Sequence, residues 1–252
     1  MPDAVDAFRK HGFVHVRSAF SGQNLECLLR CTNEIIAAPE TPGKWMKYFE
    51  KGQDDGRLLN RVENFFDYWP RLLDAFEGPA IRPLLEALFG GKYFLFKEKL
   101  NVKLDGGGGF APHQDGMAWK ILTQESITLM VAVDGADEAN GALQVDSSFS
   151  SGRRYLPHQQ GRLVEYADIV WKTIPMQPGD VIAFSSFLPH MSIRNTSGRS
   201  RRAYFVTYNA YADGDRRREY LAFKRKTFPP EVEREEGADY SDWRARLSRD
   251  LL

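Results

Sequence analysis

Two histidines and one aspartate stand in a pattern that is typical of a metal site. In the run Pro112-His113-Gln114-Asp115, a two-residue spacing on an extended strand places the imidazole and the carboxylate on the same face. His190 follows an apolar run farther along the chain. Two histidines and one carboxylate form the facial set that binds iron(II) and leaves positions open for substrate and oxygen. The pattern therefore predicts a metal site made by His113, Asp115 and His190.

The residues that follow His190 strengthen this prediction, because a single His-x-Asp pair occurs easily by chance. Ser192 shares a strand face with His190. Arg201 follows across a Ser197-Gly198 turn, and an antiparallel return is expected to bring its guanidinium beside His190. A guanidinium forms a bidentate pair with a carboxylate. Arg202 is expected to face the opposite way.

The first third of the chain, residues 1–92, is predicted to be mostly helical. Ser21 is a candidate N-cap for an amphipathic helix that ends at Pro39. A second helical region covers about Asp67 to Phe89, with Pro79 near a helix start and Gly90-Gly91 as the stop. Between them, Thr41 to Tyr68 has no clear periodicity and is predicted to be irregular and rich in aromatic residues.

From residue 93 to 210 the chain changes to short β-type runs separated by turn residues, the pattern of a sandwich or barrel. A helical end follows over 211–252, from about Arg216 to Thr227 and again after Ser241. The predicted fold is therefore mainly β with flanking helices: one double-stranded β-helix domain, a jelly-roll or cupin-like barrel, spanning 1–252. The predicted runs are Tyr93 to Leu104, Ser126 to Val133, Ala142 to Val145, Trp171 to Met176, Asp180 to Phe184 and Ala203 to Asn209.

Five elements in order resemble the phytanoyl-CoA dioxygenase-like family of iron(II)/2-oxoglutarate oxygenases. They are His113-Gln114-Asp115, Asn140-Gly141-Ala142-Leu143, Pro178-Gly179-Asp180, His190 and Arg201. The resemblance covers roughly residues 93–209, and more loosely the opening run 11–14. It implies an enzyme that uses Fe(II), 2-oxoglutarate as co-substrate and O2 to hydroxylate an unactivated C–H bond.

Carried over by position, the resemblance also implies roles for single residues. His113, Asp115 and His190 would bind the iron, Arg201 would pair with the distal carboxylate of 2-oxoglutarate, and Ser192 would assist it. Asn101 and Lys103 lie on the preceding strand, where relatives often contact 2-oxoglutarate. A lysine on a strand is also commonly a solvated edge residue, so both readings of Lys103 stay open.

The substrate is expected to be a small molecule. Aromatic rings such as Trp119 and Tyr48 could form a cage for an organic cation or could simply pack in the core. Arg153 and Arg194 could meet an anionic group, and Gln114 lies between two predicted metal ligands. The run from His113 to Trp119 is similar to bacterial family members that hydroxylate 2-aminoethylphosphonate or 2-(trimethylammonio)ethylphosphonate. A natural-product or acyl-thioester hydroxylase, a zinc hydrolase on a barrel and a non-catalytic jelly-roll binding protein are the alternatives.

Composition limits the other function classes. The 34 basic and 34 acidic residues give a formal net charge of zero, so neither nucleic acid nor a membrane is an expected partner. We expect a cytoplasmic protein, because no apolar stretch could span a bilayer. We also expect a monomer or a homodimer. The two cysteines, Cys27 and Cys31, sit four apart on a predicted helix, where disulfide geometry is poor. They are predicted to be reduced.

Overall fold

The computed structural model describes residues 2–51, 56–119, 121–150 and 154–241. Within them the helices are α1 (Pro2–His11), α2 (Gly22–Ala37), α3 (Pro70–Phe76), α4 (Arg82–Phe89) and α5 (Arg217–Thr227), with 3-10 turns η1 (Asp115–Ala118), η2 (Tyr211–Asp213) and η3 (Glu231–Glu233). The strands are β1 (Phe13–Val16), β2 (Met46–Lys51), β3 (Arg57–Glu63), β4 (Tyr93–Lys103), β5 (Phe110–His113), β6 (Ile127–Ala132), β7 (Gln144–Asp146), β8 (His158–Gln159), β9 (Arg162–Leu163), β10 (Trp171–Thr173), β11 (Val181–Ser185), β12 (His190–Ser192) and β13 (Arg201–Ala210).

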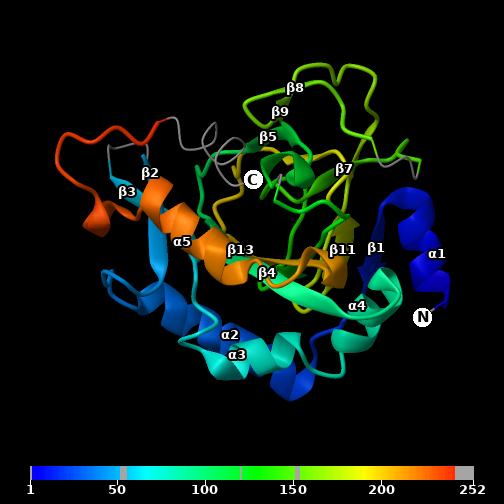
Figure 1. Ribbon diagram of the computed structural model, residues 1–252, viewed down its shortest axis with the longest axis horizontal. Helices are drawn as coiled ribbons and strands as arrows, with labels where there is room; N and C mark the ends of the chain where they lie inside the picture. The colour runs from blue at the N-terminus through cyan, green and yellow to red at the C-terminus, as the bar shows by residue number, and fades with distance from the viewer. Residues whose placement is uncertain (1, 52–55, 120, 151–153, 242–252) are drawn as a thin grey trace.

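The strands form two antiparallel sheets and a small hairpin. The large sheet has the order β1-β11-β6-β13-β4-β3-β2, the small sheet has the order β10-β7-β12-β5, and β8 pairs with β9. In Figure 1, α2 and α3 lie on one side of the large sheet, while β5, β7 and the hairpin lie on the other. From β4 to β7 and again from β10 to β13, consecutive strands alternate between the two sheets, which confirms the predicted jelly-roll fold.

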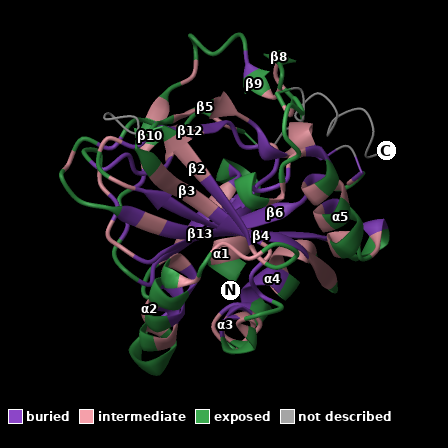
Figure 2. Cartoon of the chain, turned by 90° about the vertical axis from the view of Figure 1, so that its left-hand side faces the viewer, coloured by how far each residue is buried: buried purple, intermediate pink, exposed green. Residues whose placement is uncertain are grey.

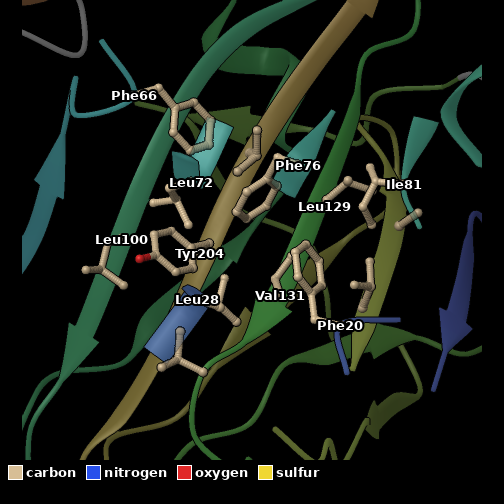
Figure 3. Close-up of a cluster of buried hydrophobic side chains, with 14 of the residues drawn as sticks. Phe20, Leu28, Phe66, Leu72, Phe76, Ile81, Leu100, Leu129, Val131 and Tyr204 are labelled. Atoms are coloured by element: carbon tan, nitrogen blue, oxygen red, sulfur yellow. The ribbon is translucent and has the colours of Figure 1, made fainter. Parts of the chain in front are cut away.

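The larger apolar core lies between the helices and the large sheet. Leu28 of α2 and Phe76 of α3 are fully buried against Leu100, Leu129 and Tyr204 of the sheet (Figure 3). Burying one such side chain stabilises the fold by about 1.5–3 kcal/mol. Tyr204, labelled in Figure 3, brings a polar hydroxyl group into this apolar core. The hydroxyl forms a hydrogen bond with Thr32 Oγ1 at 2.7 Å.

A second apolar cluster lies between the two sheets. Met130, Phe184 and Phe205 project from the large sheet toward Leu143 and Val145. Successive residues of a strand face opposite sides, so the central strands are buried on both faces, as their purple colour in Figure 2 shows. The even-numbered residues 204, 206 and 208 of β13 face the helices, and 203 and 205 face the small sheet.

The prediction for residues 41–68 was wrong, because this segment supplies two strands of the large sheet. β2 pairs with β3, and β3 pairs with β4 through Arg61, Val62 and Glu63. Charged residues face the interior of the protein on these strands, so the alternation of apolar and polar residues that marks a strand is absent. Pro79 does not begin a helix either, since Pro70 and Pro83 occupy the first turns of α3 and α4.

Residues 1–92, predicted to be mostly helical, also contain β1, β2 and β3. Several single expectations for the flanking segments are confirmed: α2 begins after Ser21, α4 ends at Phe89 with Gly90 at φ 70° as its cap, and α5 covers the predicted range. Cys27 and Cys31 are free thiols. The predicted helix after Ser241 lies outside the described residues. None of the described helices is long and apolar enough to cross a membrane.

Candidate active site

The two predicted histidine ligands come from neighbouring strands of the small sheet. His113 ends β5 and stands directly opposite His190 in β12, and the centroids of the two rings are 4.1 Å apart. Asp115 Oδ1 lies 3.7 Å from His113 Nε2 and 3.9 Å from His190 Nε2. One ligand atom from each residue lies within 4.8 Å of the others. The three side chains therefore converge on one point inside the barrel.

The local structure that brings Asp115 to this point differs from the prediction. His113 and Asp115 do not share a strand face, because β5 ends at His113 and Asp115 begins the 3-10 turn η1. Gln114 between them is still extended, with φ −121° and ψ 127°. One extended residue is enough to keep the side chains before and after it on the same side, so the predicted convergence is confirmed.

Both histidines are held in the tautomer that a metal requires. Nδ1 of His113 lies 2.8 Å from the Ala111 carbonyl oxygen, and Nδ1 of His190 lies 2.9 Å from the Leu188 carbonyl oxygen. A carbonyl oxygen only accepts hydrogen bonds, so each Nδ1 must carry the proton. The lone pair of each neutral ring is then on Nε2, the atom that faces Asp115.

The charge states of the three groups also suit a metal. Burial, together with the neighbouring His190, lowers the pKa of His113 to about 3, and burial lowers the pKa of His190 as well. Burial alone would raise the pKa of Asp115, but the neighbouring His190 and the ammonium groups of Lys99 and Lys97 lower it. At neutral pH the site offers two uncharged imidazoles and one carboxylate, which is the deprotonated set that binds a divalent ion.

Thr128 orients the carboxylate of Asp115 through the oxygen atom Oδ2. Its hydroxyl donates to Asp115 Oδ2 at 3.2 Å and lies 3.0 Å from the hydroxyl of Thr207. All three residues are buried. Hydrogen bonds of this kind fix the orientation of a ligating group and are commonly worth a factor of 10–100 in metal affinity.

Arg201 points into a small cavity beside the histidines. This cavity is also lined by Asn101, Ser192 and Phe205. Arg201 is 1% exposed, its Nε has no partner within the described residues, and burial lowers the pKa of its guanidinium to about 10. A buried cation without an anion is costly, so the arrangement is suited to an anionic ligand.

The predicted route by which Arg201 reaches the site was wrong. β13 does not return beside β12, because β12 pairs with β5 and β7, whereas β13 pairs with β4 and β6. Arg201 reaches the cavity from the large sheet and faces His190 across the space between the sheets. The prediction for Arg202 is confirmed, since it faces the other side and forms a bidentate pair with Asp134.

Lys103 is buried at 3% exposure and is not a solvated edge residue. Its Nζ donates to Ser192 Oγ at 2.8 Å and to the Ile193 carbonyl oxygen at 2.6 Å. The neighbouring turn must contain glycine, because a Cβ on Gly141 would lie 2.4 Å from that carbonyl oxygen and 2.9 Å from Lys103 Nζ. Asn101, two residues earlier on β4, has a buried Oδ1 without a partner in the described chain.

A cavity of about 510 Å³ opens in front of the metal ligands. Ligand pockets commonly have volumes of about 300–1,000 Å³. Trp119, predicted as a substrate residue, lines this cavity, as do Phe49 and Phe110. The hairpin β8–β9 stands at its edge through the exposed residues His158 and Arg162.

Several predicted substrate residues have other roles. Tyr48 is buried behind the cavity wall, and the Arg61 guanidinium lies 4.5 Å from its ring centroid. Gln114 is bonded to the backbone of Arg154, Leu156 and Phe187. Arg194 is exposed and donates to the Gly106 carbonyl oxygen. Arg153, which was predicted to meet an anionic group, lies outside the described residues.

The prediction missed five cationic residues that line the cavity, namely Arg61, Lys97, Lys99, Arg162 and Lys224. The sequence contains a pattern that could have identified two of them. Lys97, Lys99, Asn101 and Lys103 alternate with Glu98, Leu100 and Val102 along β4. Every second residue of this part of the strand is polar, so one whole face of it is polar. Such a face is unusual on a central strand unless it lines a polar cavity.

The chain matches the phytanoyl-CoA dioxygenase (PhyH) family over residues 8–203. It is 42% identical over 238 residues to a 2-aminoethylphosphonate dioxygenase of the uncultured bacterium HF130_AEPn_1, covering 93% of this chain and 91% of that protein. It is 35% identical over 234 residues to a methylphosphonate hydroxylase of Gimesia maris, covering 89% and 86%.

Solved structures share the fold at low identity. EctD from S. alaskensis with 2-oxoglutarate and 5-hydroxyectoine has a TM-score of 0.71 at 18% identity, covering 84% of this chain and 77% of that one. The epimerase SnoN with Fe3+, alpha ketoglutarate and nogalamycin RO has a TM-score of 0.70 at 18% identity, covering 83% of each. The family match over residues 8–203 and the identity to the two relatives show that the chain belongs to the phytanoyl-CoA dioxygenase family.

Proposed function

We propose that the protein is an Fe(II)/2-oxoglutarate-dependent oxygenase that hydroxylates a C–H bond of a small phosphonate, with 2-aminoethylphosphonate as the preferred candidate. The observation that carries the proposal is the convergence of His113, Asp115 and His190 beside the buried, unpaired guanidinium of Arg201. In the overall reaction, the substrate, O2 and 2-oxoglutarate give the alcohol, succinate and carbon dioxide.

The donor set fits iron(II). Two Nε2 lone pairs and one carboxylate occupy one side of the site, and the two cavities border the other side. Iron(II) bound there supplies the activation of oxygen that breaks an unactivated C–H bond. The protein holds the ligands in place through the two Nδ1 bonds and the hydroxyl of Thr128.

Arg201 is the proposed partner of the distal carboxylate of 2-oxoglutarate, and Ser192, Asn101 and Lys103 are proposed to contact the same molecule. The planar guanidinium provides two parallel donors to one carboxylate. Leu143, Met191 and Phe205 surround this cavity with apolar atoms. They exclude water from the co-substrate, which strengthens the charge pair.

The substrate class is supported by the two phosphonate-acting relatives and by the charges of the larger cavity. Five cationic side chains line it, while the acids in its wall are Glu50, Glu63 and Asp115. An acyl thioester or a large natural product would need a longer apolar surface. The cavity volume of about 510 Å³ and its charged lining favour a small anion.

A zinc-dependent hydrolase and a non-catalytic binding protein are less consistent with this site. Neither function needs a buried arginine directed at a position beside the metal ligands. Oxygen consumption separates both alternatives from the proposed function, because neither a hydrolase nor a binding protein consumes O2.

The direct test incubates the iron-loaded protein with 2-oxoglutarate, O2 and 2-aminoethylphosphonate, and measures succinate and the hydroxylated phosphonate together. We expect equal amounts of both products. His190→Ala should abolish the reaction, whereas His11→Ala, which removes an exposed histidine at the end of α1, should leave it unchanged. Oxygen-independent release of phosphate, or no product with any small phosphonate, would contradict the proposal.

A further inference from the structure

Apart from the exposed Arg162, the cationic residues that line the larger cavity are of two kinds. Arg61 donates to Glu63 Oε1 at 2.6 Å, and Lys224 Nζ lies 3.8 Å from the same carboxylate oxygen. By contrast, Lys97 and Lys99 form no hydrogen bond or ion pair with any side chain that the structure describes. Their ammonium groups lie over aromatic rings: Lys97 lies over Trp119 and Tyr220, and Lys99 lies over Phe205.

On this basis, and resting on the proposed function, we propose that Lys97 and Lys99 bind the phosphonate dianion of the substrate. The corner formed by Trp119 and Tyr220 then holds the protein's own Lys97. It does not serve as a cage for the ammonium group of the substrate.

A β-bulge in β4 places Lys97 in this corner. Thr207 of β13 is opposite Lys97, but Tyr208 is opposite Leu95, so Phe96 is the extra residue. Leu95 faces the helices, while Phe96 and Lys97 both face the ring of Trp119. A bulge of this kind redirects side chains and is common beside active sites.

The rings give Lys97 a defined position. Its Nζ is 3.9 Å from the centroid of Trp119 and 5.6 Å from that of Tyr220. Phe96 packs against both rings, at centroid distances of 5.6 Å and 4.8 Å. A cation over an aromatic face is held by electrostatic attraction, so this face is already occupied and a trimethylammonium group would have to displace Lys97.

The ammonium groups of Lys97 and Lys99 favour the binding of an anion at this position. Burial, followed by the repulsion of Lys99, lowers the pKa of Lys97 to about 7, and burial also lowers the pKa of Lys99. A dianion between the two ammonium groups would restore both charges and form charge-assisted hydrogen bonds. Two cations match the two negative charges of a phosphonate.

The location suits the proposed reaction. Lys99 lines both cavities, and both lysines act electrostatically on Asp115. A phosphonate held by the two lysines therefore lies close to the metal ligands. The carbon bonded to phosphorus is then the one nearest the metal, and it is the carbon that we expect to be hydroxylated.

The test compares Lys97→Met and Lys99→Met with Lys172→Met, which removes an exposed lysine on β10. Three probes are titrated into the anaerobic Fe(II)/2-oxoglutarate protein: 2-aminoethylphosphonate, methylphosphonate and 2-(trimethylammonio)ethylphosphonate. We expect each cavity variant to weaken 2-aminoethylphosphonate and methylphosphonate alike, by about 10- to 100-fold, since each loses one bond to a charged group. The 2-oxoglutarate complex of Lys97→Met should be unaffected, because Lys97 lines only the larger cavity, and Lys172→Met should bind all three probes as the wild type does.

Two results would overturn the inference and leave the proposed function intact. One is unchanged binding of methylphosphonate in both cavity variants. The other is a Lys97→Met protein that loses affinity only for the amine-bearing compound, or that binds the trimethylammonium compound more tightly. If the wild-type protein forms the 2-oxoglutarate complex but binds no phosphonate, the proposed substrate class fails as well.

Discussion

Lys103 of β4 donates from Nζ to Ser192 Oγ of β12 at 2.8 Å, and this hydrogen bond connects the two sheets inside the barrel. Arg201 stands directly opposite Lys103 in the neighbouring strand. Burial, followed by the repulsion of Arg201, lowers the pKa of Lys103 to about 7. The protein thus keeps two basic side chains next to each other on neighbouring strands, and Arg201 lines the small cavity. A bound dicarboxylate would stabilise this arrangement.

Replacement of Arg201 by methionine is therefore expected to weaken 2-oxoglutarate binding. Loss of a buried bidentate pair costs about 2–5 kcal/mol, so the KM for 2-oxoglutarate should rise at least about 30-fold. Arg202→Met is the matched control, because Arg202 is the next residue and pairs with Asp134 on the opposite face. Similar values of KM for the two variants would contradict the assignment.

Gly141→Ala is expected to be more destabilising than Gly198→Ala. Both glycines have positive φ, 73° and 71°, but a Cβ at Gly198 would meet nothing within 4 Å. Gly198→Ala should cost about 1 kcal/mol of unfolding free energy, the strain of a left-handed residue. Gly141→Ala adds the overlap with the Ile193 carbonyl oxygen and should cost about 2–3 kcal/mol more. Urea denaturation measures both, and equal costs would be inconsistent with the close approach.

The buried lysines predict a pH dependence of stability in the metal-free protein. The pKa of Lys97 is about 7 in the folded state and about 10.4 in an unfolded chain. Between these values the unfolded state binds the additional proton, so the free energy of unfolding rises with pH from about 7 to 10. Lys97→Met removes this contribution, so at pH 7 the variant should be more stable than the wild type.

The same measurement provides its own check. The difference in unfolding free energy between Lys97→Met and the wild type should shrink as the pH rises, because the lysine becomes neutral in both states near pH 10. The groups that act on Lys97 are Lys99, Asp115, Glu63 and Arg61. A difference that stays constant from pH 7 to 10 would show that the folded-state pKa of Lys97 is not lowered.

Much of the active site could be predicted from the sequence, because it depends on local spacing. One extended residue between His113 and Asp115 suffices to bring them together, and this holds whether Asp115 continues a strand or begins a turn. The apolar runs in β6 and β13 and the alternation of polar and apolar residues in β4 also identified the central strands. These features follow from periodicity alone.

Features that depend on tertiary context could not be predicted. β2 carries Glu50 into the cavity, and β3 carries Arg61 and Glu63. These charged residues conceal the strand pattern of both segments. The path of Arg201 to the site depends on which strands pair, which the sequence does not specify. Because of the bulge at Phe96, Leu95 and Lys97 face opposite sides of the sheet. Strict alternation along the strand would predict that they face the same side.

Thr128→Val is expected to weaken metal binding without preventing folding. The change keeps the shape of the buried side chain but removes the hydroxyl that donates to Asp115 Oδ2. Affinity for Fe(II) should fall by about 10- to 100-fold, as measured by anaerobic metal titration. Thr128→Ser retains the hydroxyl and should bind iron nearly as the wild type does. If valine and serine behave alike, the hydroxyl does not orient the carboxylate.

The most direct test of the central claim is anaerobic reconstitution with Fe(II) and 2-oxoglutarate, followed by visible absorption spectroscopy. The account predicts a metal-to-ligand charge-transfer band in the wild type that is lost in His113→Ala and, at moderate 2-oxoglutarate concentration, in Arg201→Ala. The absence of the band in folded, iron-loaded wild-type protein would contradict the proposed function. Retention of the band in His113→Ala would contradict the proposed metal ligands.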